Sequence, residues 1–204
     1  MSLSWSQIFR LGLVQMALGS IVVLTTSTLN RLMVVEFSLP ALLPGALVGL
    51  HYGIQLSRPR WGFRSDVGGN RTRWIIGGMI TLALGGVGAT YAVTLFAVHY
   101  WLALTASILS YGMIGIGVGA SGTSLLALLA TATAADRRAA AATITWLMMI
   151  FGIALTAGVS GQFLDPYSPQ RLMTVVSVIA LLAIVLTVLA IWNIERSVSS
   201  RASE

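Results

Sequence analysis

Side chains that could bind a metal or move a proton are scarce in this sequence, and its two histidines are the first to consider. His51 lies well inside an apolar run, beside Tyr52, whereas His99 lies at the end of another run. Gln55 follows His51 by four residues, so a helix would place both on one face. A neutral imidazole can ligate a metal ion, but a lone histidine in an apolar helix more often hydrogen-bonds to a neighbouring helix. His51 and Gln55 are therefore candidate ligand-binding residues, and His99 is a third.

A second polar cluster, formed by Asn30, Arg31 and Glu36, lies at the end of the first apolar run. A charge costs about 2.5–3.5 kcal/mol at the middle of a membrane-spanning helix and less near its ends. Arg31 and Glu36 therefore either pair across the following turn or each contact lipid head groups. The sequence does not favour one of these arrangements over the other.

Familiar enzyme motifs are missing from the sequence. It contains no paired carboxylates within an apolar run, no Ser-His-Asp spacing, no HExxH and, without lysine, no phosphate-binding Gly-x-x-x-x-Gly-Lys. A proton-coupled carrier would usually bury a carboxylate midway along a span. The six acidic residues instead all fall at the ends of runs or in loops, at Glu36, Asp66, Asp136, Asp165, Glu195 and Glu204. The missing motifs predict that the chain is not an enzyme, and the lack of a carboxylate within a span counts against proton-coupled antiport.

The elements that must position these residues are apolar helices. The 204 residues are 56% hydrophobic and 9% charged, whereas soluble domains are about 25% charged, so the predicted solvent is a lipid bilayer. A span needs about 20 residues, and six runs are long enough: 9–34, 39–57, 74–96, 101–130, 139–163 and 172–193. Because a lipid-exposed backbone must satisfy its own hydrogen bonds, we predict an all-α transmembrane fold. It is a six-helix bundle forming a single domain, with 194–204 as a polar tail.

Arginine supplies all twelve basic residues, and its distribution predicts the orientation. The segment 57–73 alone holds five arginines and a single acid, Asp66. If six helices alternate, ten arginines fall on one side and only Arg31 and Arg171 on the other. The positive-inside rule then places both termini and this segment in the cytoplasm. Arginines at the ends of spans also argue against nucleic acid as a partner, despite the net charge of +6.

Small residues are concentrated in the third, fourth and fifth runs, for example Gly78, Gly115, Gly119 and Gly152. In lipid, small residues let helices approach closely. Dense helix packing is one interpretation of this pattern. The other is a glycine-lined face that leaves room for a flat or long ligand between helices.

The arginine-rich segment also carries a spaced pattern of residues: Gly62, Asp66, Gly69, Arg71 and Arg73. The pattern resembles the signature of the loop between the second and third helices of the major facilitator superfamily, and it stands at the same place in the chain. It departs from that signature at Val67 and Asn70, where the family has basic residues. The resemblance implies that Gly62 lets two helices meet closely and that Asp66 caps a helix or pairs with an arginine. It also implies that Arg71 and Arg73 contact lipid phosphates.

Three separated stretches carry a more specific resemblance: TLNRLMVVEFSLPA (28–41), GASGTSLLALLA (119–130) and the segment 137–172. They resemble the PucC/LhaA family, a bacteriochlorophyll-delivery branch of the major facilitator superfamily, and the likeness runs from about Arg10 to Trp192. It implies a multi-pass protein of the bacterial inner membrane, cytoplasmic or intracytoplasmic. Such a protein would help assemble the light-harvesting antenna by binding or delivering bacteriochlorophyll. Antenna polypeptides or the reaction-centre core would be its partners.

Members of that family have twelve helices in two related halves, and this chain resembles the N-terminal half. The sequence leaves open whether it is a fragment or a half-protein that pairs with itself or with another half. Two alternative functions also stay open: a half-size transporter acting as a dimer, and a permanent structural subunit at the edge of a photosynthetic complex.

The resemblance gives the histidines a specific candidate role. Bacteriochlorophyll magnesium takes one axial ligand, commonly a neutral imidazole. His51 is therefore the candidate axial ligand to the magnesium, and Gln55 and His99 are further candidate pigment contacts.

Overall fold

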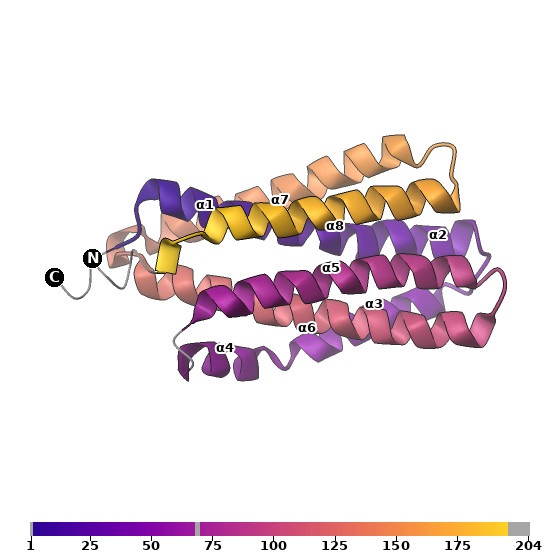
Figure 1. Ribbon diagram of the computed structural model, residues 1–204, viewed down its shortest axis with the longest axis horizontal. Coiled ribbons are helices and arrows are strands. Elements are labelled where there is room, and N and C mark those ends of the chain that lie inside the picture. The colour runs from indigo at the N-terminus through magenta and orange to yellow at the C-terminus, as the bar shows by residue number, and fades with distance from the viewer. Residues whose placement is uncertain (1, 68–69, 196–204) are drawn as a thin grey trace.

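The computed structural model describes residues 2–67 and 70–195, and every regular element within these ranges is a helix. The helices lie side by side in one elongated bundle (Figure 1). In chain order they are α1 (Trp5–Val23), a π-helical turn (Leu24–Thr28), α2 (Leu29–Val35), α3 (Leu42–Gln55), α4 (Arg58–Val67), α5 (Arg71–Leu95), α6 (Tyr100–Ala132), a 3-10 turn (Ala135–Arg137), α7 (Arg138–Phe163) and α8 (Pro169–Ile191). The predicted all-α class is confirmed for the described chain.

In the described ranges, five helical stretches are long and apolar enough to cross a membrane. They match five of the six predicted runs closely, and they are Trp5–Val35, Arg71–Leu95, Tyr100–Ala132, Ala135–Phe163 and Pro169–Ile191. The helix periodicity and length of an apolar run are local properties, so the sequence alone could place these elements.

The predicted second span, 39–57, needs a correction. Helix α3 has only 14 residues, which extend about 21 Å at 1.5 Å per residue, whereas the hydrocarbon core is about 30 Å thick. Pro59 explains the early end, because it has no N–H to donate to the carbonyl of Gln55 and so cannot continue α3. After a short turn, α4 continues toward the same end of the bundle (Figure 1).

The first span contains a π-helical turn, Leu24–Thr28. The hydroxyls of Thr25 and Thr26 donate to the carbonyl of Val22 at 3.0 and 2.8 Å. Tyr111 of α6, which is fully buried, donates its hydroxyl to the carbonyl of Thr25 at 2.7 Å. A π turn interrupts the regular helical ladder, and here a side chain from another helix satisfies a carbonyl that the interruption affects.

Glycines bring several helices into backbone contact. A Cβ added at Gly78 of α5 would lie 2.4 Å from the backbone nitrogen of Ser121 on α6. One added at Gly152 of α7 would lie 2.5 Å from the carbonyl oxygen of Met16 on α1. The dense-packing interpretation is therefore confirmed at these positions, whereas a Cβ at Gly77 would have no atom within 4 Å.

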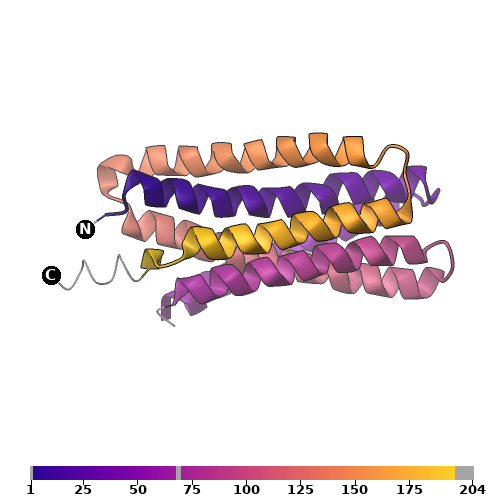
Figure 2. The same ribbon diagram turned by 45° about the horizontal axis from the view of Figure 1, so that its top comes forward.

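The arginine-rich segments gather at one end of the bundle, where α1, α5 and α7 begin and α6 and α8 end (Figures 1 and 2). Arg10 joins two of these ends, because its Nε donates to the carbonyl of Ala190 at 2.9 Å and its Nη2 to the carbonyl of Trp192 at 2.6 Å. A guanidinium is favourable at the C-terminal carbonyls of a helix. The side of the membrane on which this end lies stays a prediction.

Candidate ligand-binding sites

The predicted site on α3 is a line of three polar side chains that continues to the start of α4. His51 is fully buried, and Gln55 is 9% exposed. Nε2 of Gln55 lies 2.7 Å from Nε2 of His51, and Oε1 of Gln55 accepts a hydrogen bond from the guanidinium of Arg58. The structure thus places His51 and Gln55 on one face, as their spacing predicts, and adds Arg58 to them.

The donors and acceptors in this line can be assigned because arginine only donates. Oε1 of Gln55 accepts from Arg58, so Nε2 of Gln55 donates and Nε2 of His51 accepts. Neutral His51 then carries its proton on Nδ1, which has no hydrogen-bond partner among the described residues. Neither ring nitrogen is open to a metal, so His51 as placed does not fit an axial ligand. Ligation of magnesium by His51 stays a prediction that requires Gln55 to release Nε2.

We expect Gln55→Ala to destabilise the protein, because it leaves Nε2 of buried His51 without its partner. An unsatisfied buried group costs about 1–3 kcal/mol, and the free energy of unfolding in detergent should fall by that amount. The double variant His51→Leu/Gln55→Leu removes both polar groups and should recover most of the loss. A double variant as unstable as Gln55→Ala would contradict the hydrogen-bond role.

His99 lies away from this line. His99 is exposed and precedes α6. The carbonyl oxygen of His51, by contrast, would lie 2.8 Å from a Cβ added at Gly115 of α6. At 1.5 Å per residue, Gly115 lies about 24 Å along α6 from His99. The structure therefore does not bring the two histidines together.

Asn30, Arg31 and Glu36 do not form one site either. Asn30 donates to the carbonyl of Thr26 one turn earlier, at 3.5 Å. Arg31 and Glu36 are both exposed, and no ion pair joins them in the part of the chain that the structure describes. Burial raises the pKa of Tyr167, in the turn between α7 and α8, and the nearby Glu36 carboxylate adds to that rise.

The signature positions are divided between two helices. A Cβ added at Gly62 of α4 would lie 3.4 Å from Cγ2 of Thr123 on α6, which fits the expected close approach of helices. Arg71 does not simply face lipid, because its Nη1 donates to the carbonyl of Ala127 at 3.2 Å and also to the hydroxyl of Thr131. Arg73 is exposed. The side chain of Asp66 and the whole of Gly69 lie outside the described residues.

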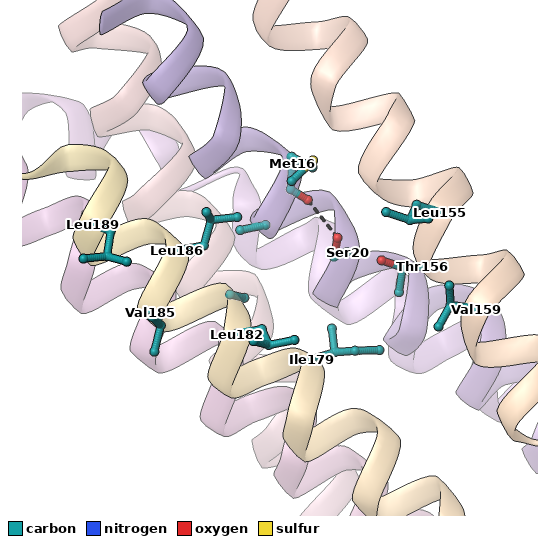
Figure 3. Close-up of a pocket in the computed structure, with 12 residues that line it drawn as sticks. Met16, Ser20, Leu155, Thr156, Val159, Ile179, Leu182, Val185, Leu186 and Leu189 are labelled. Atoms are coloured by element: carbon teal, nitrogen blue, oxygen red, sulfur yellow. Dashed lines mark hydrogen bonds between the residues drawn. The ribbon is translucent and has the colours of Figure 1, made fainter. Parts of the chain in front are cut away.

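An apolar slot of about 450 Å³ lies between α1, α7 and α8 (Figure 3). Its walls are almost entirely aliphatic, and they include Met16, Leu155, Val159, Ile179, Leu182 and Leu186. Two hydroxyls interrupt them. That of Ser20 donates to the carbonyl of Met16 at 3.0 Å. That of Thr156 has no hydrogen-bond partner among the described residues, although Thr156 is only 7% exposed.

Sequence reasoning missed this slot. Its residues come from the first, fifth and sixth predicted runs, and each looks like an ordinary residue of an apolar helix. Ser20 and Thr156 were the available signal, since both are polar residues inside spans. Single hydroxyls in helices usually bond to their own backbone, so the sequence could not distinguish Thr156 from the others.

Comparison with known proteins identifies the family. The family model described as PUCC protein matches residues 28–204. The bacteriochlorophyll synthase 44.5 kDa chain of Rhodobacter capsulatus is 66% identical, over 96% of this chain and 46% of its own length. The PucC protein of the same organism is 30% identical, over 98% of this chain and 46% of its own, and that of Cereibacter sphaeroides is 30% identical, over 93% and 44%. The chain thus spans about half the length of these relatives.

One of these matches contradicts the prediction that the chain is not an enzyme. The relative with 66% identity is named as a chain of a bacteriochlorophyll synthase, and that name associates it with an enzyme. The missing motifs represent only a few reaction classes, and their absence says nothing of other reactions.

The fold agrees with the family match in character. Five apolar helices of spanning length in the described chain are those of a multi-pass membrane protein. No solved structure matches the chain, so the resemblance to the major facilitator superfamily stays a prediction. The family model covers well over half of the 204 residues. The chain belongs to the PUCC protein family.

Proposed function

We propose that this chain binds bacteriochlorophyll in the membrane and takes part in the synthesis of the pigment or its delivery to photosynthetic complexes. The observation that carries the proposal is the apolar slot between α1, α7 and α8 with the unpartnered hydroxyl of Thr156. The names of the relatives with 66% and 30% identity point to the same pigment and to the same family.

The slot fits part of such a pigment. Sites for small ligands are mostly apolar, with a few placed polar groups, and they measure about 300–1,000 Å³. Leu182 and Leu186 of α8 and Leu155 of α7 would contact an apolar ring or tail, and Thr156 would donate to an oxygen at its edge. When bound, bacteriochlorophyll supplies a magnesium-bearing ring that absorbs light, which makes its binding measurable.

Leu182→Trp tests the proposal, because it fills the slot. Leu181→Trp is the matched control: Leu181 and Leu182 are 61% and 60% exposed, but Leu181 does not line the slot. The full chain is expressed in Rhodobacter capsulatus and purified in mild detergent, and bacteriochlorophyll absorbance is measured per mole of protein. We expect pigment with the unmodified chain and with Leu181→Trp, and at least about a fivefold loss with Leu182→Trp, as removal of roughly 1 kcal/mol or more of binding free energy requires.

Thr156→Val tests the hydroxyl separately, since valine keeps the shape. Loss of one hydrogen bond weakens binding by about 1 kcal/mol, so pigment should fall severalfold. Equal pigment in all variants, or none with the unmodified chain, contradicts the proposal.

The partners implied by this function are antenna polypeptides or the reaction-centre core in the bacterial inner membrane. Crosslinking in those membranes, followed by identification of the attached proteins, tests them. Crosslinks only to proteins unrelated to photosynthesis would contradict this part of the proposal.

A further inference from the structure

We propose that a second cavity, at the corner formed by α4, α5 and α6, is a binding site for an anionic phospholipid. This cavity is separate from the apolar slot, which lies between α1, α7 and α8. Its volume is about 550 Å³. The residues that carry the inference are Trp61, Arg73, Trp74, Gly77 and Ile116, all of which line it.

Two tryptophans form one wall of the cavity. The ring centroids of Trp61 and Trp74 are 5.8 Å apart, and their planes are tilted by 57°. Nε1 of Trp61 donates to the hydroxyl of Ser57 at 2.9 Å, which holds the ring. The same edge of the Trp61 ring lies against α6, where a Cβ added at Gly119 would lie 3.3 Å from Cδ1 and 3.5 Å from Nε1. Tryptophan favours the interface between hydrocarbon and head groups, so this wall indicates the depth of a lipid head group.

Arg73 supplies a positive charge at the polar end of the cavity. Its backbone nitrogen donates to Oδ1 of Asn70 at 3.2 Å, but its guanidinium forms no hydrogen bond or ion pair with the described residues. None of the described residues that line the cavity is acidic. Arg71, two positions earlier, is bound to the end of α6. An anionic group is therefore the complement that this end of the cavity lacks, and a phosphate matches the guanidinium.

The other end of the cavity is open and apolar. Gly77 lies one turn after Arg73 on α5, so both fall on one face, and a Cβ at Gly77 would have no atom within 4 Å. Ile116 of α6 is 38% exposed beside it. The hydroxyl of Thr81 donates to the carbonyl of Gly77 at 2.9 Å and is thus satisfied. A head group at Arg73 would let an acyl chain lie along Gly77 and Ile116.

The test uses the full chain in phosphatidylcholine nanodiscs that contain a small fraction of phosphatidylglycerol with brominated acyl chains, which quench tryptophans in contact with them. The same fraction of brominated phosphatidylcholine is the neutral comparison. The signal of the cavity is the part of the quenching that Trp61→Phe/Trp74→Phe removes. We expect this part of the quenching to be at least twofold greater with brominated phosphatidylglycerol than with brominated phosphatidylcholine. Arg73→Gln and Gly77→Leu should each abolish this difference between the two lipids.

Matched variants separate the cavity from general effects. Arg60→Gln removes an exposed arginine that does not line the cavity, and Gly158→Leu enlarges another glycine with no atom within 4 Å of an added Cβ. Both variants should keep the excess quenching. Arg73→Lys keeps the positive charge, so it should keep the excess as well, and it is the variant to measure if Arg73→Gln does not fold. Equal quenching by the two lipids, an excess that survives Arg73→Gln, or loss of the excess on adding inorganic phosphate would overturn the proposal.

Discussion

Gly78→Ala is expected to destabilise the bundle more than a methyl group would at most helical positions. The added Cβ would lie 2.4 Å from the nitrogen of Ser121 and 2.9 Å from the carbonyl oxygen of Gly117. Both atoms belong to the backbone of α6, so neither can move aside as a flexible side chain would. Overpacking of this kind costs about 1–3 kcal/mol, and a lower unfolding midpoint in detergent should report the loss.

The neighbouring glycine provides the control for this prediction. A Cβ added at Gly77 would have no atom within 4 Å. Alanine is favoured over glycine inside a helix by about 0.8–1.0 kcal/mol, so Gly77→Ala should leave stability unchanged or raise it slightly. Equal destabilisation by the two substitutions would mean that α5 and α6 do not approach each other as the structure places them.

Glu195→Ala is expected to release the start of α5. One oxygen of the Glu195 carboxylate accepts from the backbone nitrogen of Arg71 at 2.8 Å. The other accepts from the nitrogen and the hydroxyl of Thr72 at 2.9 and 2.7 Å. A carboxylate is also favourable at the positive end of a helix. Hydrogen bonds to a charged group are worth about 1.5–3 kcal/mol, so the free energy of unfolding should fall by about that amount. The backbone amides of Arg71 and Thr72 should also exchange faster with solvent.

Glu36→Ala is the comparison for Glu195→Ala. Glu36 is an exposed acid at the opposite end of the bundle, in the turn between α2 and α3. Substitutions at exposed positions of this kind usually change stability by less than about 0.5 kcal/mol. If the two variants were equally stable, the carboxylate of Glu195 would not be holding α5.

Local rules predicted most of the elements but not all of their lengths. The runs that became α5 to α8 were predictable because apolar length is a local property. The run 39–57 was overestimated, although Pro59 was a readable sign of the early end of α3. The bundle also uses Ile194 and Glu195, the first residues of the predicted polar tail: Ile194 is fully buried, and Glu195 caps α5.

In the site on α3, one contact could be predicted from the sequence and another could not. The pairing of His51 with Gln55 followed from their spacing, because residues four apart share a helical face. The role of Arg58 did not, because it depends on the turn that Pro59 introduces between α3 and α4. The apolar slot and the tryptophan cavity are each lined by residues from three helices, and no property of one helix could predict either.

The sequence by itself determined the apolar helical class, the positions of the long helices and the clustering of arginines at span ends. Composition and periodicity depend on residues that are close in the sequence, so they do not depend on how the helices pack. The tertiary structure alone decided which glycines touch a backbone and which, like Gly77, open onto a cavity. It also decided that Arg71 is held by α6 while the side chain of Arg73 is exposed, and that the hydroxyl of Thr156 faces an apolar slot. Those differences depend on how the helices pack against one another. Residues of the same type along one helix look alike in the sequence, so the sequence alone cannot distinguish them.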